Sequence, residues 1–148
     1  MSSDIHNITF DCADPHAVAR FWGEVTGWPV LDIEVPEPGG PECSVGLPSP
    51  ARPRLYFVQV PEGKTVKNRV HLDVMPNDRT QQEELDRLGA LGARIVSDRR
   101  PEVGWVILAD PEGNEFCVEL SRAEIAELEA AEALEAAEAA RAAGVSQS

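Results

Sequence analysis

The chain contains two segments with the same order of sequence features, and this repeat constrains its fold more than any other feature. Each segment begins with polar and apolar residues in alternation, continues through a polar turn into an amphipathic helical pattern, and contains a glycine before an apolar run. The first reads NITFDCADPHAVARFWGEVTGWPV and the second RVHLDVMPNDRTQQEELDRLGALGARIV. Two copies of one unit predict a pseudo-twofold fold whose chemistry lies where the copies face each other.

The first unit shows the signals of one helix and four strands. Residues 5–12 alternate in the way of a half-buried strand. Asp14 followed by Pro15 is typical of a helix start, and apolar residues recur at helical spacing up to Gly27. Turns rich in proline and glycine then separate three short predicted strands, at 29–35, 42–47 and 54–60.

The second unit repeats this order. His71 and Asp73 alternate with aliphatic residues in its first predicted strand. Asp78 is predicted to cap the following helix, and Gly92 to end it. Three further strands are predicted at 94–97, 104–109 and 115–120. The fold class is therefore predicted to be α+β with two βαβββ modules.

The predicted domain boundaries follow from these modules and from a change in composition at residue 122. One domain is expected over 1–121, with module one at 4–61 and module two at 68–121. Residues 122–148 are rich in Ala, Glu and Leu and predict a C-terminal helix and tail. Its thin apolar stripe leaves two alternatives open, a helix that docks on the domain or a partner and a largely solvated tail.

Composition and charge restrict the class of protein. A length of 148 residues with 43% hydrophobic residues suits one compact domain. The net charge of −13 argues against nucleic-acid binding. No apolar run approaches the roughly 18 residues of a membrane span, and the first residues lack a signal-peptide pattern, so we expect a cytoplasmic protein without membrane contact. Three cysteines without CxxC spacing indicate reduced, structural thiols.

Several of these segments resemble the glyoxalase, bleomycin-resistance and extradiol-dioxygenase superfamily, also called vicinal oxygen chelate proteins. The resemblance rests on NITFDCADPHAVARFWGEVTGW, RVHLDV, ELDRLGALGARIV and above all WVILADPEGNEFCVEL, and it covers residues 5–120. It implies a curved, incomplete eight-stranded barrel with a ligand cleft between the modules. Members of this superfamily often dimerise, so the resemblance also implies a homodimer.

The resemblance also implies where metal ligands would lie. The family's first ligand position falls on Asn7, whose amide is a poor ligand for a transition metal, and the second falls on His71. The position three residues after the asparagine of DPxGN, where metal-binding members commonly carry Glu, is occupied by Cys117. Phe57 is expected to be its counterpart in the first module. Only His71 matches the usual ligand set, so no cofactor is expected, although a divalent metal remains an alternative.

The remaining candidate site residues follow from strand alternation. Asp73 and Glu119 are expected to face His71, as partners for proton transfer. By pseudo-twofold symmetry Asn7 would match His71, and Thr9 would match Asp73. An apolar wall for a small organic ligand is expected from Leu55, Phe57 and Trp105.

Two classes of function fit these residues. The first is a small-molecule binding protein or a metal-free enzyme that uses His71, Asp73 and Glu119 for proton transfer, with Asn7, Thr9, Leu55, Phe57, Trp105 and Cys117 around the ligand. The alternative is a lyase, isomerase or dioxygenase that depends on a divalent metal held by His71. We expect the first because most of the ligand positions are lost.

Overall fold

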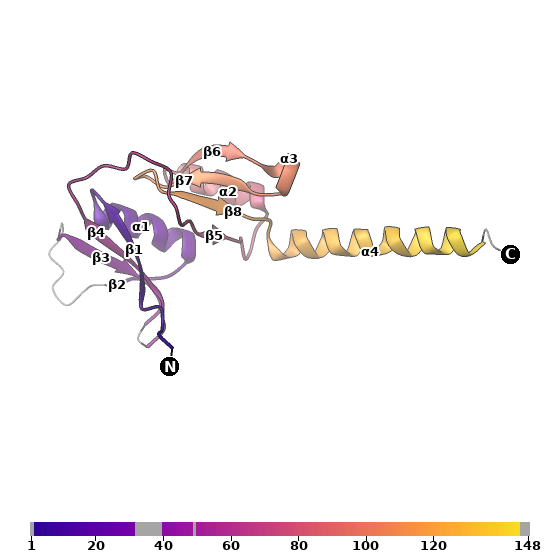
Figure 1. Ribbon diagram of the computed structural model, residues 1–148, viewed down its shortest axis with the longest axis horizontal. Coiled ribbons are helices and arrows are strands. Elements are labelled where there is room, and N and C mark those ends of the chain that lie inside the picture. The colour runs from indigo at the N-terminus through magenta and orange to yellow at the C-terminus, as the bar shows by residue number, and fades with distance from the viewer. Residues whose placement is uncertain (1, 32–39, 49, 146–148) are drawn as a thin grey trace.

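The computed structural model describes residues 2–31, 40–48 and 50–145, and the side chains up to residue 141. The predicted α+β class is confirmed, with two four-stranded mixed sheets and four helices. The sheets have the orders β1-β4-β3-β2 and β5-β8-β7-β6, so each βαβββ module forms its own sheet (Figure 1). Within the described residues these two sheets do not close into a barrel.

The first module contains β1 (Asn7–Cys12), α1 (Pro15–Thr26), β2 (Val30–Leu31), β3 (Glu42–Val45) and β4 (Arg54–Gln59). The predicted helix start is confirmed, because the Asp14 side chain accepts a hydrogen bond from the Ala17 amide. Gly27 ends the helix at φ 69°, a left-handed conformation that favours glycine. Most of the strand predicted at 29–35 falls at 32–39, outside the described residues.

The second module contains β5 (Asp73–Val74), α2 (Gln81–Ala90), β6 (Arg94–Asp98), α3 (Arg100–Val103), β7 (Val106–Ala109) and β8 (Glu115–Val118). The prediction of Asp78 as the helix cap is wrong. Thr80 is the N-cap, and it forms a reciprocal capping box with Glu83. The expected first strand shortens to β5, although the Cys117 amide still donates to the Leu72 carbonyl.

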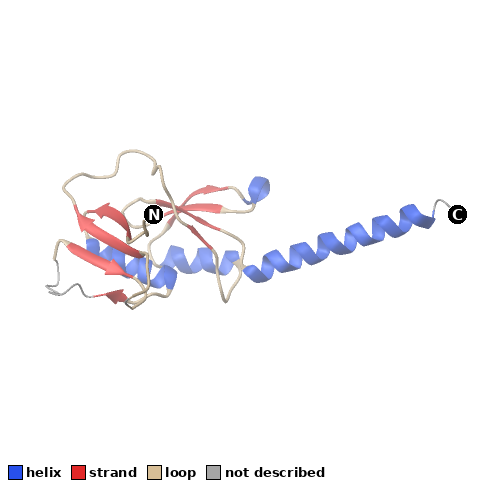
Figure 2. Ribbon diagram, turned by 60° about the horizontal axis from the view of Figure 1, so that its bottom comes forward, coloured by secondary structure: helices blue, strands red, loops and turns tan. Residues whose placement is uncertain are grey.

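The two modules share one hydrophobic core around the helices. α1 covers the first sheet, and its Phe21 and Trp22 also meet Phe116 of β8, with ring centroids 6.0 and 5.2 Å apart. Arg87 in the last turn of α2 donates to the Glu24 carbonyl near the end of α1, so the C-terminal ends of the two helices meet (Figure 2). Each sheet therefore buries the face toward the helices and leaves its other face open.

The C-terminal helix α4 (Arg122–Val145) extends away from this body, as both ribbon views show (Figures 1 and 2). Ile125 is half-buried near its start, whereas Leu128 and Leu134 are exposed. In the single chain the described side chains from 126 to 141 are exposed, and docking of this helix on a partner stays a prediction. Among the described residues, no helix combines the length and the apolar surface needed to cross a bilayer.

Candidate functional site

Strand pairing in the second module places three of the predicted site residues on one open face. β5 and β8 pair in parallel with Asp73 opposite Cys117, and His71 shares their face because it lies two residues before Asp73. The His71 Nε2 atom lies 3.3 Å from Asp73 Oδ1. One ligand atom from each of the three residues lies within 4.8 Å of the others. The structure thus assembles an imidazole, a carboxylate and a thiol.

Burial and negative charge shape the electrostatics of this cluster. Burial, followed by the charge of Asp73, raises the pKa of the Cys117 thiol to about 11. Burial, followed again by Asp73, raises the pKa of Glu119. The two carboxylates therefore repel each other near a thiol that stays protonated at neutral pH. A proton or a cation bound among them would relieve this repulsion.

A pocket of about 260 Å³ opens beside the cluster. Its apolar wall consists of Val103, Trp105, Ile107 and Phe116. Its polar lining includes His71 and Cys117, together with Lys67, Asn68, Arg99 and Glu115. Trp105 thus lies where a ligand wall was predicted, and all of the lining residues come from 67–117.

Local contacts hold the edges of this pocket. The Arg99 amide donates to the Trp105 carbonyl, which closes the loop around the short helix α3. Glu115 accepts from the Asn68 amide and from Lys64 Nζ, each at 3.0 Å, so β8 anchors the connector before β5. These hydrogen bonds make the rim of the pocket a structured part of the module.

The first-module candidates are divided between the two faces of their sheet. Leu55 and Phe57 lie in the hydrophobic core, 3% and 0% exposed, so they do not form the predicted ligand wall. The strand pairing also corrects the predicted symmetry mate of Cys117. Thr9 pairs with Tyr56 as Asp73 pairs with Cys117, so the mate is Tyr56 and not Phe57. The sequence was misleading because the register of β4 could not be fixed without its partner strand.

Asn7 and Thr9 lie on the open face of β1, at the positions that match His71 and Asp73. Thr9 lines a separate hollow of about 690 Å³ with the connector 60–69, not the pocket that contains His71. The cleft predicted between Asn7 and His71 is therefore not assembled by the strands of this single chain.

Several polar residues around these faces were missed by the sequence reasoning. Lys67 and Arg99 line the second-module pocket, while Ser44 and Arg54 lie on the open face of the first sheet. A connector lysine or a strand-end arginine resembles any solvated residue in the sequence. Only the alternation of Ser44 with buried Cys43 and Val45 was an available signal.

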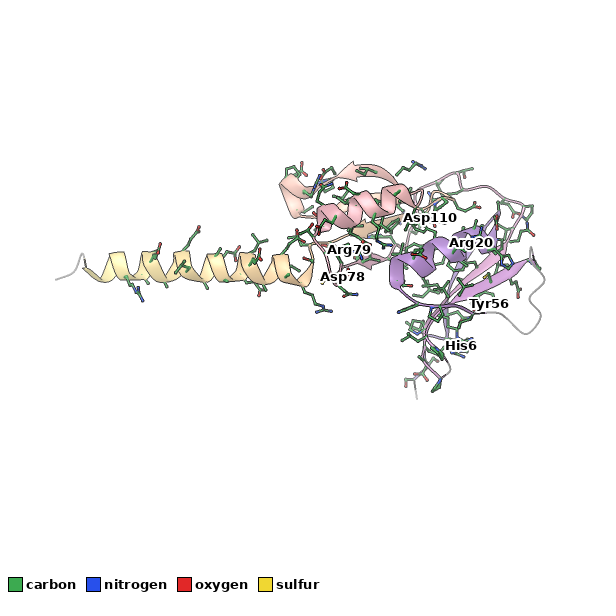
Figure 3. The ribbon with its side chains drawn as sticks, turned by 180° about the vertical axis from the view of Figure 1, so that it is seen from behind. His6, Arg20, Tyr56, Asp78, Arg79 and Asp110 are labelled. Carbon is green, nitrogen blue, oxygen red and sulfur yellow. The ribbon has the colours of Figure 1, made fainter. Side chains whose placement is uncertain are left out.

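A buried aspartate links the modules at the DPEGN turn. Asp110 accepts hydrogen bonds from the backbone amides of Glu112 and Asn114, both at 2.9 Å, and from Trp22 Nε1 at 3.1 Å. Asp110 lies beside α1 in the view from behind (Figure 3). The turn motif therefore has a second role, because it fixes the second module against the helix of the first.

Two βαβββ modules with open sheet faces and a polar cluster at the second-module strand pair define the glyoxalase/bleomycin-resistance/dioxygenase class. The sequence matches the family model described as a glyoxalase-like domain over residues 7–119, and the chain belongs to this family. No curated protein matches the sequence.

Solved structures with the same fold come from this superfamily. The fosfomycin resistance protein FosX from Mesorhizobium loti is 16% identical, with a TM-score of 0.60 over 80% of this chain and 92% of that chain. FosX from Listeria monocytogenes, in complex with Mn(II) and 1S,2S-dihydroxypropylphosphonic acid, is also 16% identical, with a TM-score of 0.62 over 80% and 93%. Glyoxalase I from Leishmania major is 16% identical, with a TM-score of 0.57 over 93% and 99%. At these identities the likeness establishes the fold.

Proposed function

We propose that the chain binds a small organic molecule in the second-module pocket, as a binding protein or a metal-free enzyme. The observation that carries this proposal is the hollow of about 260 Å³ with Trp105 and Ile107 on one side and the pair of His71 and Asp73 beside it. An apolar wall with a few convergent polar groups is typical of small-molecule sites. A cytoplasmic location stays a prediction.

His71 is the residue to which we assign a direct role. Its contact with Asp73 favours the tautomer in which Nε2 carries the proton and leaves Nδ1 as an acceptor. In a metal-free enzyme His71 would exchange a proton with the ligand, and Asp73 would orient the ring. In a binding protein the same atoms would hydrogen-bond a polar group of the ligand. Glu119 would add to the negative charge around Asp73.

We also propose that a second copy of the chain completes the site. The side chains of His71 and Asp73 remain 43% and 56% exposed, so the pocket is open on their side. Its volume lies below the roughly 300–1,000 Å³ of drug-sized sites. The first-module face of a partner, with Asn7 and Thr9, would supply the missing half, in line with the predicted homodimer.

A divalent metal at His71, Asp73 and Cys117 is the second candidate. Imidazole, carboxylate and thiolate form a donor set that zinc accepts. Zinc bonds of roughly 2.0–2.3 Å place tetrahedral ligand atoms about 3.3–3.8 Å apart. Small side-chain rotations would therefore bring the three atoms, now within 4.8 Å, into range, and the residues fit the ion. When bound, it would act as a Lewis acid on a substrate oxygen.

Metal content separates the two candidates. The protein would be purified without chelators, and zinc and manganese would be measured by mass spectrometry in the wild type, in His71→Ala and in His6→Ala. His6 is the matched control because it is exposed and contacts Arg52 away from the pocket. The metal-free proposal predicts substoichiometric metal in all three. About one ion per chain in the wild type and the control, lost in His71→Ala, would overturn it in favour of the second candidate.

Ligand binding is tested by thermal shift against a panel of small aromatic and polar compounds. A ligand at 100 times its Kd stabilises the folded state by about 2.7 kcal/mol, which a melting curve detects. We expect the shift to disappear in Trp105→Ala and to persist in Trp28→Phe, a tryptophan that packs against the core. Equal shifts in the wild type and Trp105→Ala would contradict the proposed site. Turnover of any hit, followed by chromatography, distinguishes enzyme from binding protein.

A further inference from the structure

The open face of the first sheet carries polar atoms that are buried without a partner. Strand register arranges this face in rows: Asn7, Arg54 and Gly46 form one row, and Thr9, Tyr56 and Ser44 form the next. Asn7 Oδ1, Arg54 Nε and Ser44 Oγ are all shielded from solvent and have no hydrogen-bond partner among the residues that the structure describes. Three such atoms in two adjacent rows are unusual, because each unpaired buried group costs roughly 1–3 kcal/mol.

Arg54 is the charged group among them. It is half-buried, and no ion pair or side-chain hydrogen bond holds it within the described part of the chain. Its stem lies against Gly46, where a Cβ atom would come within 2.7 Å of Arg54 Cγ. The glycine therefore allows the arginine to lie along the sheet instead of rising into solvent. This position keeps the guanidinium close to the face that carries Ser44 and Asn7.

Ser44 gives an independent indication of a ligand. Its side chain is only 1% exposed, and register places it beside Tyr56, on the face opposite to buried Cys43 and Val45. Neighbouring Tyr56 is already satisfied, because its hydroxyl donates to Glu42 at 2.6 Å. Within the described part of the chain, the Ser44 hydroxyl and the Arg54 Nε–H group therefore both lack a hydrogen-bond partner.

We propose that Arg54, Ser44 and Asn7 form a subsite for the carboxylate group of a small organic anion. A guanidinium presents two parallel N–H groups that match the two oxygens of a carboxylate, and a hydroxyl adds a third donor. The Asn7 amide can turn its nitrogen toward the same group. The inference rests on the proposed function in treating the open sheet faces as ligand surfaces, and it narrows the ligand to one with an acidic end.

Nuclear magnetic resonance titration tests this subsite with sodium benzoate as the probe and benzamide as its uncharged counterpart, at constant ionic strength. In ¹⁵N-labelled protein, the Arg54 Nε–Hε signal and the Ser44 backbone amide are expected to shift saturably with benzoate and not with benzamide. In R54Q the Ser44 response should weaken at least about tenfold in Kd, and R54K should lie between. R20Q is the matched control, because Arg20 is exposed on α1, which covers the other face of this sheet.

Each outcome decides for or against the subsite. No shift with benzoate, equal shifts with benzamide, or unchanged binding by R54Q would overturn it. Inorganic phosphate that moves the same signals with higher affinity than benzoate would overturn the assignment to carboxylates. The wild-type Arg54 signal keeps the test valid if R54Q fails to fold. The Trp105 indole signal reports on the second-module pocket separately, so a failure of the proposed function and a failure of this inference are distinguishable.

Discussion

The hydrogen bonds of Asp110 provide a quantitative test of how the two modules are held together. The side chain is 1% exposed and accepts from two backbone amides, from the Asn114 side chain and from the indole of Trp22. Asp110→Ala would leave these donors unpaired. Each buried unpaired donor costs roughly 1–3 kcal/mol, and the Glu112 amide is near enough to the surface to find water. We therefore expect a loss of about 3–5 kcal/mol in the free energy of unfolding.

The link across the modules is isolated by a double-mutant cycle. Trp22→Phe removes the indole N–H and also leaves a smaller ring in the core, so it should cost at least the roughly 1.5–3 kcal/mol of a hydrogen bond to a charged group. Because Asp110→Ala already breaks that bond, the double variant should be more stable than the sum of the single losses predicts, by about 1–2 kcal/mol.

The assay is urea denaturation at pH 7, followed by circular dichroism, with melting curves as a second measurement. For a chain of this size 1 kcal/mol corresponds to about 2–4 °C in Tm. Asp98→Ala is the control, since this exposed acid pairs with Arg100 on the surface and should change stability far less than Asp110→Ala. A loss below about 1 kcal/mol for Asp110→Ala, or strictly additive single losses, would refute the argument.

Two further predictions concern the thiols and the second helix. Burial raises the pKa of both Cys12 and Cys117 from 9.0 to about 11, so the unfolded chain releases these protons first, and stability should fall as pH rises from 9 to 11. The urea midpoint should therefore drop less over this range in the double variant Cys12→Ala, Cys117→Ala than in the wild type. An equal drop in both proteins would contradict the attribution of the pH dependence to these two thiols. Thr80→Ala should lower the free energy of unfolding by about 0.5–2 kcal/mol because Thr80 caps α2, and Asp78→Ala should lower it less. A larger loss for Asp78→Ala than for Thr80→Ala in urea denaturation would contradict the role of Thr80 as the cap.

The fold was predictable because its signals are local and repeated. Asp14 and Pro15 start α1, and Gly27 ends it, with chemistry that needs no tertiary contact. Because the same order of strand and helix signals occurs twice, the sequence also predicted the division into two βαβββ modules. The N-cap of α2 was mistaken because Asp78 and Thr80 are both good caps, and only the reciprocal bond to Glu83 selects Thr80.

The candidate site was predictable only where strand alternation was unambiguous. Leu72, which lies between His71 and Asp73, points to the other face of the strand, so these two polar residues share a face. Cys117 lies on that face as well because it pairs with Asp73. In β4 both faces carry apolar or aromatic residues, so Phe57 was assigned to the wrong one. Ser44 and Arg54 became candidates only because the described structure leaves a buried polar atom of each without a hydrogen-bond partner. A sequence does not reveal which polar groups stay unpaired in the fold.

The position of the shared core explains why the proposed site is open on one side in the single chain. Phe21 and Trp22 of α1 contact Phe116, so the helix-covered sides of the two modules meet and their open faces are left to solvent. One open face carries the pair of His71 and Asp73, and the other carries Arg54, whose Nε–H group has no partner among the described residues. If a second copy brings these faces together, a ligand with an acidic end at Arg54 would have its remainder against Trp105.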